Sequence, residues 1–435
     1  MYYINTTMKI AVIGLGYVGL STTATLLKLG HNVLGVDIDK SKVLNLQKGI
    51  CPINEPGIID VINENKNNIT FSYSNAPIQD YNIVFICVNT PESKTGEADL
   101  TALFKVIDEA VIHAKYGDTI VIRSTIPVGT TRKISNMFQQ NRPSANISVI
   151  FAPEFLRQGS ALDDSLNPDR MVFGVQNESQ QIMMERIFMG IKAPKLFVSY
   201  ESAELAKYAS NNFLATKISF FNEIGNIASK TNADMEEIQS ILSYDKRLGE
   251  GYMSPGVGYG GGCLVKDTKA LYHQAKDLGI ATPVIKGAID QNSSQKLILL
   301  KELKKIYSGK KIKNLAKEKI LIVGISFKGV SSDLRNSIAL ENVNELKGLT
   351  KNIYLYDPIV SSEEKKKLKF KNFSSLADGV NEAKIIMVFT ERNEINDLPD
   401  EAFKDKIVLD GRGVLDFNKA KLCSHYFSVG RNIQK

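Results

Sequence analysis

The chain has 435 residues, of which 43% are hydrophobic and 23% are charged, and its formal net charge is +7. This composition is that of a globular protein, and the length predicts two or three domains rather than a single core. No apolar run reaches the roughly 20 residues that a membrane-spanning helix needs, and the polar first eight residues lack the apolar core of a signal peptide, so we expect no membrane partner.

Short β-branched runs alternate with helical patterns through the first half of the chain. Strands that alternate with helices predict a parallel sheet, and their uninterrupted apolar character is typical of a sheet covered on both faces. The expected helices include residues 18–29 and 100–114. The expected strands are residues 9–14, 33–37, 82–88, 119–124 and 147–151.

The glycine-rich run GLGYVG follows the first predicted strand and opens the first predicted helix. Gly14 permits a tight turn, Gly16 lets the backbone approach a pyrophosphate, and Gly19 allows the helix to pack closely on the strand. The start of the helix then faces the phosphates. The sequence therefore predicts a dinucleotide site.

Asp37 ends the next predicted strand, at the distance where a carboxylate meets the ribose hydroxyls of a dinucleotide. A carboxylate there repels a 2′-phosphate, which favours NAD over NADP as the cofactor. Lys42 is close enough in the chain to soften that preference.

The pattern changes near residue 201. Residues 201–242 contain no strand-like run and predict one long helix or two in succession. The Gly- and Pro-rich residues 249–262 predict a loop, after which a helical pattern resumes at Asp267.

Alternation returns in the last third of the chain and predicts a second, smaller α/β domain. Asp357, Thr390 and Asp410 end three of its strands, where such sheets bind ligands. The lysine-rich segment before this domain, residues 301–319, is interpreted as a solvated connector. It is not interpreted as a nucleic-acid site, because no aromatic residues interleave with its lysines. The expected strands are residues 319–324, 352–357, 384–389 and 406–410.

The fold class expected from these patterns is α/β, with two Rossmann-like parallel-sheet domains joined by a central helical region. The expected domains are residues 8–200, which bind the dinucleotide, 201–305, which form the helical region, and 315–435, which form the second α/β domain.

The four cysteines, Cys51, Cys87, Cys263 and Cys423, are widely spaced and form no CxxC pair. This pattern argues against a structural zinc site and against a disulfide scaffold, and the four scattered histidines offer no ligand cluster, so we expect no metal. A reducing cytoplasm is the simplest compartment, and one cysteine is then available as a working thiol. Cys87 lies within an apolar strand and is expected in the core.

Cys263 is the cysteine whose surroundings favour reactivity. It follows a glycine-rich loop, comes just before a predicted helix, and is followed by Lys266. A helix N-terminus and a nearby lysine both stabilise a thiolate, which is the nucleophilic form of the side chain.

Three further segments carry polar groups at suggestive positions. Glu154 and Thr125 each follow a predicted strand. Lys207 and Asn211 are four residues apart on a predicted helix and share one face, where a cation and an amide can hold a developing oxyanion. Taken alone, each has an ordinary structural explanation.

Together these segments resemble the UDP-glucose/GDP-mannose dehydrogenase family, from about residue 8 to beyond residue 412. In combination the motifs are highly specific. They are GLGYVGL (14–20), VNTP (88–91), STIPVGT (124–130), PEFLRQGSALDD (153–164), NPDR (167–170), ELAKYASNNFLATKISFFNE (204–223), GVGYGGGCLVKDTKAL (256–271), ISFKGVSSDLRNS (325–337) and DGRGVLD (410–416).

The resemblance implies an NAD domain, a central dimerisation region that makes a homodimer, and a nucleotide-sugar domain. It implies that Cys263 is the nucleophile, that Lys207, Asn211 and Asp267 surround the reacting carbon, and that Glu154 serves the hydrolytic step. The residues that it implies for NAD binding, with the glycines of the run above, are Val18, Asp37, Lys42, Thr90, Thr125, Gln158, Lys266 and Arg335.

A second set of residues is implied for the UDP-sugar substrate, and Arg247 resembles an arginine that family members donate across the dimer. The full set is Glu154, Phe155, Leu156, Arg157, Gln158, Lys207, Asn211, Arg247, Tyr252, Met253, Ser254, Pro255, Gly256, Gly260, Lys328 and Arg412.

The implied reaction is a four-electron, NAD-dependent oxidation of the C6 alcohol of UDP-glucose to a carboxylate. An aldehyde formed first is held by Cys263 as a thiohemiacetal, oxidised to a thioester and hydrolysed. Lys207, or a water held by Asp267, is the candidate base.

The chain departs from the family pattern in two places. Gln158 stands where the family usually has an acid, so a charge there is lost, although the amide can still position the nicotinamide. Leu264 and Val265 replace a common Phe-Pro pair before Lys266, which changes the stiffness expected of that loop.

Three alternatives remain open at this point. The same chemistry on a UDP-N-acetylhexosamine or on GDP-mannose is the nearest. A two-electron dehydrogenase of the hydroxyacid type would use the Lys207 and Asn211 face without needing Cys263. A non-catalytic NAD-binding sensor would bind the cofactor without turnover.

Overall fold

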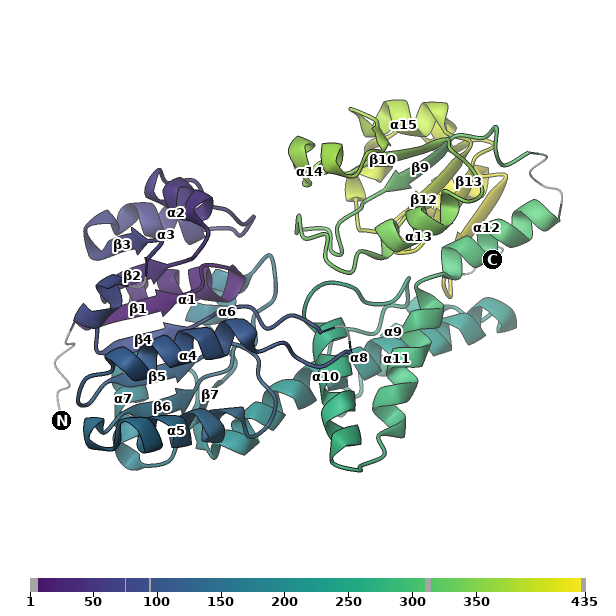
Figure 1. The fold of residues 1–435 in the computed structure, drawn as a ribbon. Helices are drawn as coiled ribbons and strands as arrows, with labels where there is room; N and C mark the ends of the chain where they lie inside the picture. Colours follow the sequence, from purple (N-terminus) through teal and green to yellow (C-terminus); the bar gives the residue numbers. More distant parts are fainter. Residues whose placement is uncertain (1–6, 75, 94, 310–313, 432–435) are drawn as a thin grey trace. The chain divides into compact units, whose positions relative to one another are not determined.

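The computed structural model describes residues 7–74, 76–93, 95–309 and 314–431. It separates into two compact units, Met1–Ser210 and Asn211–Lys435. The boundary falls inside one long helix, α8 (Tyr200–Thr231), which begins in the first unit and ends in the second (Figure 1).

The N-terminal unit is built on an eight-stranded sheet with the order β3-β2-β1-β4-β5-β6-β7-β8. The first six strands are parallel, which confirms the predicted sheet. β7 runs antiparallel to β6, and β8 runs parallel to β7. The strands are β1 (Lys9–Ile13), β2 (Asn32–Val36), β3 (Ile69–Ser72), β4 (Ile83–Ile86), β5 (Thr119–Ile122), β6 (Ser148–Phe151), β7 (Met171–Gly174) and β8 (Lys195–Val198).

Helices cover both faces of this sheet. Alternate residues of β1 point to opposite faces, so that Ile10 and Val12 join one core cluster and Ala11 and Ile13 join the other. This explains why its strands are apolar throughout. The helices are α1 (Tyr17–Lys28), α2 (Lys40–Gln47), α3 (Ile58–Glu64), α4 (Thr101–His113), α5 (Thr130–Asn141), α6 (Ala161–Leu166) and α7 (Glu178–Ile187).

The second unit begins with the remainder of α8 and four further helices. The predicted helical region is divided at Asp234, whose side chain caps a new helix by accepting from the N–H groups of Glu236 and Glu237. Residues 249–262 form the predicted loop, but the helix after it begins at Leu264, three residues before the predicted start. The helices are α9 (Met235–Ser243), α10 (Leu264–Asp277), α11 (Pro283–Gln295) and α12 (Ile298–Ser308).

A six-stranded, fully parallel sheet completes the second unit, with the order β11-β10-β9-β12-β13-β14. Four of its strands were predicted, and β11 and β14 were not. The strands are β9 (Ile320–Val323), β10 (Ile353–Tyr356), β11 (Lys371–Asn372), β12 (Ile385–Val388), β13 (Ile407–Asp410) and β14 (His425–Ser428); the helices are α13 (Ile338–Leu346), α14 (Ser362–Lys367), α15 (Leu376–Glu382) and α16 (Phe417–Leu422).

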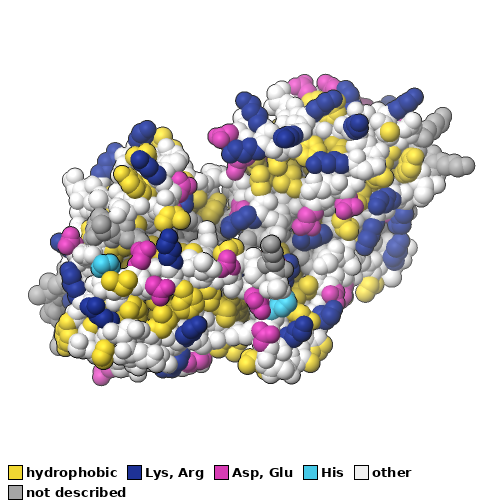
Figure 2. Space-filling model, viewed as in Figure 1, with side chains coloured by type: hydrophobic (Ala, Val, Ile, Leu, Met, Phe, Trp, Pro, Cys, Tyr) yellow, Lys and Arg dark blue, Asp and Glu magenta, His cyan; other side chains and the backbone are white. Residues whose placement is uncertain are grey.

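The lysine-rich segment has the amphipathic character of a surface helix. Leu299 and Leu303 of α12 are buried, while Lys301, Lys304 and Lys305 are exposed. Figure 2 shows Lys and Arg side chains gathered over this part of the second unit. Residues 310–313 of the predicted connector lie outside the described residues. None of the described helices is both long and apolar enough to cross a membrane.

Candidate functional site

The glycine-rich turn after β1 has the geometry that its sequence predicts. Gly14 has a φ of +91°, and a Cβ there would lie 2.8 Å from the carbonyl oxygen of Cys87. A Cβ on Gly19 would lie 1.7 Å from the carbonyl oxygen of Gly14, so no side chain is possible. At Gly16 the nearest other atom would be 3.9 Å away, which leaves the backbone open to an approaching group.

Helix α1 starts directly after this turn, and no side chain caps its N-terminus. The N–H groups of a first helical turn have no partner within the helix, and they attract phosphate oxygens together with the helix dipole. The open backbone at Gly16 and this uncapped helix fit the pyrophosphate of a dinucleotide.

Asp37 lies immediately beyond the end of β2, 7% exposed, and is held from three sides. Its carboxylate accepts from the N–H of Leu15 at 2.8 Å, from the N–H of Asp39 at 2.9 Å and from Nζ of Lys42 at 2.7 Å. Burial acts to raise the pKa of Asp37, but the hydrogen bonds from Lys42, Asp39 and Leu15 outweigh it and hold the pKa below its usual value. The ionised carboxylate suits ribose hydroxyls, and Lys42 is already bonded to it.

Glu154 and Lys207 form a buried ion pair in the N-terminal unit. Nζ of Lys207 lies 3.1 Å from Oε1 of Glu154, and the two side chains are 5% and 8% exposed. Burial acts to raise the pKa of Glu154, yet Lys207, the N–H of Leu156 and the nearby Arg123 together lower it. The sequence singled out both partners without predicting that they would pair.

Phe155 lies between two cations. Its ring centre is 3.9 Å from Cζ of Arg170 and 5.2 Å from Nζ of Lys207. The next charged residue along the chain, Arg157, forms a forked ion pair with Asp164. The PEFLR segment is therefore fixed by cation–π and ionic contacts on both sides of Leu156.

The loop that carries Thr125 is tied to two neighbouring segments. The hydroxyl of Thr90 donates to the carbonyl of Thr125 at 2.7 Å. Glu204 of α8, fully buried, accepts from the N–H groups of Gly129 and Thr131 and so caps α5. Sequence reasoning missed Glu204, although it lies one turn before Lys207, because a buried carboxylate on a helix gives no pattern of its own.

Cys263 is the exposed cysteine among the four, and it occupies the N-cap position of the 14-residue helix α10. Cys87 is buried as predicted, and burial raises the pKa of its thiol to about 11. Burial also raises the pKa of Cys423, to about 12, and that of Cys51. Position and exposure therefore set Cys263 apart.

A buried polar cluster lies one helical turn beyond Cys263. Asp267, which is 1% exposed, accepts from Nδ2 of Asn211 at 2.6 Å and contacts Nζ of Lys266 at 2.5 Å. Its backbone carbonyl accepts from Nδ2 of Asn212 at 3.3 Å. Lys266, which was expected to stabilise the thiolate, has its charge paired with Asp267.

Three buried amides that sequence reasoning missed shape the loop before Cys263. Asn222 accepts from the N–H of Gly256 at 2.7 Å, and Gln295 donates to the carbonyl of the same residue at 2.6 Å. Asn292 bonds to both the N–H and the carbonyl of Tyr259. Asn292 and Gln295 lie three residues apart on the buried face of α11, which is the signal that would have found them.

The substrate segment predicted at 252–256 has one unusual backbone angle. Tyr252 is 43% exposed and has a φ of +58°, which is rare for an aromatic residue and costs free energy. Met253 is buried, whereas the hydroxyl of Ser254 bonds to Gln239. Arg247 is highly exposed and forms a forked pair with Asp245.

The second unit also brings predicted residues of its α/β domain against this loop. A Cβ on Gly256 would lie 2.7 Å from the carbonyl oxygen of Gly411 and 3.7 Å from Nη1 of Arg412, and a Cβ on Gly260 would lie 2.4 Å from the carbonyl oxygen of Asn336. A Cβ on Gly262 would lie 2.7 Å from Cζ of Arg335. Lys328 is exposed on a neighbouring loop of the same domain.

The strand ends at Asp357, Thr390 and Asp410 lie at the predicted edge, but their side chains do not face a ligand. They are 1%, 0% and 0% exposed and bond to the protein itself. Each of the three fixes an adjacent loop.

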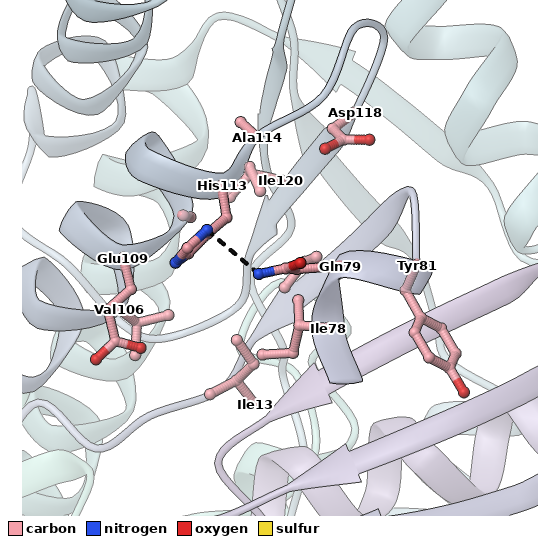
Figure 3. A pocket seen from close by; sticks show the side chains of 12 residues that line it. Ile13, Ile78, Gln79, Tyr81, Val106, Glu109, His113, Ala114, Asp118 and Ile120 are labelled. Carbon is pink, nitrogen blue, oxygen red and sulfur yellow. Dashed lines mark hydrogen bonds between the residues drawn. The ribbon is translucent and has the colours of Figure 1, made fainter. Parts of the chain in front are cut away.

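A cavity of about 310 Å³ lies away from all these groups, between α4, the short helix Ala76–Asp80 and the sheet of the N-terminal unit (Figure 3). Its lining is largely apolar, with the ring of His113 and the amide of Gln79 in contact at 3.3 Å. None of the predicted site residues lines it. Among the described residues no three His, Cys, Asp or Glu side chains are grouped to hold a metal ion.

Comparison with known families matches three consecutive domain models over most of the chain. They are the NAD binding domain, the central domain and the UDP binding domain of the UDP-glucose/GDP-mannose dehydrogenase family, at residues 8–192, 201–294 and 321–417. The NAD binding domain agrees with the glycine turn, the uncapped helix and Asp37, and identifies NAD as the cofactor.

Individual relatives agree over nearly full length. The chain is 35% identical to the UDP-glucose 6-dehydrogenase YwqF of Bacillus subtilis, over 98% of each chain, and 33% identical to TuaD of the same organism, over 97% of this chain and 93% of the relative. Among solved structures, a UDP-glucose dehydrogenase from Pyrobaculum islandicum matches with a TM-score of 0.92 and 28% identity, over 99% of this chain and 100% of the other.

A second solved structure is that of an enzyme named for a different sugar. The UDP-D-ManNAc dehydrogenase of Pyrococcus horikoshii matches with a TM-score of 0.87 and 26% identity, over 98% of this chain and 99% of the other. The relatives agree on the nucleotide-sugar dehydrogenase class and differ in the sugar. From its three domains and from these relatives, the chain belongs to the UDP-glucose/GDP-mannose dehydrogenase family.

Proposed function

We propose that this protein oxidises the C6 alcohol of UDP-glucose to the carboxylate, giving UDP-glucuronate, through a covalent intermediate on Cys263. The observation that carries the proposal is the exposed thiol of Cys263 at the start of α10, one helical turn from the buried Asn211–Asp267–Lys266 cluster. The identity to UDP-glucose 6-dehydrogenases over nearly the whole chain supports the choice of sugar.

NAD, when bound, accepts the hydride that leaves C6 in each of the two oxidations. The Sγ of Cys263 adds to the carbonyl carbon of the C6 aldehyde, so that the intermediate stays attached as a thiohemiacetal and is then oxidised to a thioester. Water attacks the thioester carbonyl, the C–S bond breaks, and the carboxylate leaves with the thiolate restored.

The groups near Cys263 have distinct roles in this proposal. Asn211 stabilises the oxyanion on the reacting carbon, and Asp267 orients water. Lys266 contacts the Asp267 carboxylate and balances its charge. A water held by Asp267 takes the alcohol proton, because Lys207, one turn before Asn211 on α8, is a cation paired with Glu154. Glu154 serves the hydrolytic step.

The remaining predicted residues hold the substrate and the cofactor. Lys328 and Arg412 bind the phosphates or the hexose, while the backbone at 252–256 and at Gly260 lines the sugar site. Thr125, Gln158 and Arg335 contact the dinucleotide, as do the glycine turn and Asp37.

A UDP-N-acetylhexosamine is the second candidate substrate. The likeness to the UDP-D-ManNAc dehydrogenase, at a TM-score of 0.87, favours it, although at 26% its identity is lower than that of the Bacillus relatives. GDP-mannose is a third nucleotide sugar within the family. The acetamido group demands space at C2 that glucose does not.

The chain has an apolar surface that suits a homodimer. Phe213, Phe220 and Ile227 follow one another at seven-residue spacing on α8 and are 67%, 53% and 56% exposed. Seven residues make almost two helical turns, so the three share one face, and such an exposed apolar stripe is typical of an interface. We propose that this face pairs with a second copy and that the exposed Arg247 reaches the partner. Light scattering of Phe220→Ser, which is expected to be monomeric, tests this.

The substrate is tested by comparing kcat/KM for UDP-glucose, UDP-N-acetylmannosamine and GDP-mannose with NAD under identical conditions. The proposal predicts the highest kcat/KM for UDP-glucose. A higher value for the N-acetylated sugar would replace the substrate and leave the chemistry intact, whereas no turnover of any nucleotide sugar would refute the proposed activity.

A further inference from the structure

We propose that Arg392 and Asp357 act as a positioning pair for nucleotide-sugar binding, because they fix the backbone of the loop that carries Lys328. Neither side chain touches the ligand in this proposal. The inference rests on the proposed role of Lys328 in binding the nucleotide sugar, and it adds two residues that the motifs did not single out for that purpose.

Asp357, immediately beyond β10, holds the start of the loop. Its Oδ2 accepts from the backbone N–H of Ile325 at 2.8 Å and from the N–H of Ser326 at 3.1 Å. Its Oδ1 accepts from Nη2 of Arg392 at 2.7 Å. One carboxylate therefore joins the loop to the arginine.

Arg392 holds the loop on both sides of Lys328. Its Nη1 donates to the carbonyl of Gly329 at 2.5 Å, and its Nη2 donates to the hydroxyl of Ser326 at 3.1 Å. That hydroxyl also lies 3.1 Å from the carbonyl oxygen of Lys328 itself. Thr390 adds a bond from its hydroxyl to the carbonyl of Ser326.

Burial separates the pair from the lysine that it positions. The side chains of Arg392 and Asp357 are 3% and 0% exposed, whereas Lys328 is exposed. A buried ion pair is a poor source of stability, since hydrophobic residues of the same volume often serve as well. What this pair supplies that apolar residues cannot is a set of directed hydrogen bonds to the loop on both sides of Lys328, which fixes where the backbone of that residue lies.

The charged state of the pair is maintained under working conditions. Burial acts to raise the pKa of Asp357, but Arg392 and the N–H groups of Ile325 and Ser326 outweigh it and lower the pKa. The carboxylate stays ionised at neutral pH, so the loop is held throughout the range in which the enzyme would work.

The test measures binding of two probes, UDP and NAD, by titration calorimetry, with KM for the nucleotide sugar as a second readout. In Arg392→Met we expect the affinity for UDP to fall roughly tenfold, and in Ser326→Ala about threefold, because a misplaced phosphate contact loses most of its value. The affinity for NAD is expected to fall by less than that for UDP, because the dinucleotide turn lies in the N-terminal unit and Arg335 is the residue of this loop proposed to contact the dinucleotide.

Lys406→Met is the matched control. Nζ of Lys406 also donates to two backbone carbonyls, those of Asn381 and Ala383, but it does so just before β13, at the opposite edge of the same sheet. The Lys406→Met substitution removes a comparable cation from the domain and is expected to leave the UDP affinity unchanged. Rescue in Arg392→Lys is expected to be partial, since one ammonium group cannot span the same three acceptors.

Two outcomes overturn the inference. If Arg392→Met and Ser326→Ala both bind UDP like the wild type, or if Lys406→Met loses UDP affinity to the same extent, the pair has no specific positioning role. Should Arg392→Met fail to fold, Ser326→Ala and Arg392→Lys decide the matter. A wild type that binds no UDP would refute the proposed function and the inference with it, whereas normal wild-type binding with unchanged variants refutes the inference alone.

Discussion

The two sheets of this protein begin in the same way. In each, a glycine of positive φ ends the first strand, with values of +91° at Gly14 and +78° at Gly324. In each, the following backbone N–H donates at 2.8 Å to the carboxylate that comes after the neighbouring strand, which is Asp37 in one sheet and Asp357 in the other.

The sheets differ in the segment that comes after the turn. In the N-terminal sheet α1 begins at Tyr17, so an uncapped helix end faces the space beside Asp37. In the C-terminal sheet residues 325–337 form a loop before α13, and Asp357 is enclosed by that loop and by Arg392. The same strand, turn and carboxylate are proposed to serve NAD in one sheet, whereas they fix a loop in the other.

The largest effect on this comparison is expected from two glycine substitutions, one at Gly19, which packs against Gly14, and one at Gly324. Gly19→Ala places a Cβ 1.7 Å from the carbonyl of Gly14, so NAD affinity is expected to fall on the order of a hundredfold. Gly324→Ala places a Cβ 2.4 Å from Cβ of Thr390 and is expected to destabilise the second unit while leaving NAD affinity unchanged in the folded protein. Calorimetry with NAD distinguishes them, and equal losses of NAD affinity in both variants would contradict the comparison.

The next largest effect is expected from the two carboxylates. Asp357→Asn leaves the buried Arg392 without its counter-charge and is expected to lower the free energy of unfolding by about 3 kcal/mol, with a smaller change in NAD affinity than Asp37→Asn causes. Asp37→Asn is expected to weaken NAD binding about tenfold with a smaller loss of stability, because the contact it loses is to the ribose. Denaturant titration and NAD binding of both variants check this, and a reversed pattern would refute it.

Acid stability extends the comparison to the buried ion pairs. The pKa values of Glu154 and Asp357 lie below the ordinary 4.5 and 3.8, so each contributes stability that is complete above those values and is lost as the pH falls through the lowered pKa. We expect Glu154→Gln to reduce the loss of unfolding free energy below pH 4.5 relative to wild type. Denaturant titrations across that range measure it, and parallel curves for the two proteins would contradict the assignment.

The smallest expected effect concerns Lys42. It contacts Asp37 at 2.7 Å and can also meet a 2′-phosphate, so Lys42→Met is expected to raise the preference for NAD over NADP by only about threefold. The ratio of kcat/KM for the two cofactors gives the answer. A variant that comes to prefer NADP would show that Lys42 does not soften the preference.

Motifs made of short, contiguous residues were the part of the site that sequence could predict. The glycine turn, Asp37 and the loop before Cys263 each depend on local spacing, and the helix predicted directly after Cys263 is confirmed. The central strands of both sheets could be predicted from their apolar runs, whereas β3, β7, β8, β11 and β14 were not predicted.

Contacts between distant segments could not be predicted from the sequence. The Glu154–Lys207 pair joins residues 53 positions apart, and Asn211 meets Asp267 across 56. The role of Glu204 appears only when α5 packs against it, because a single carboxylate on a helix gives no pattern of its own.

The most direct test of the account counts the NADH formed per UDP-glucose consumed. We predict two for the wild type and for Cys423→Ala, whose thiol is held protonated by a pKa of about 12, and at most one for Cys263→Ser, in which the second oxidation has no thiohemiacetal to act on. Two NADH per UDP-glucose sustained by Cys263→Ser would contradict a covalent role for this residue.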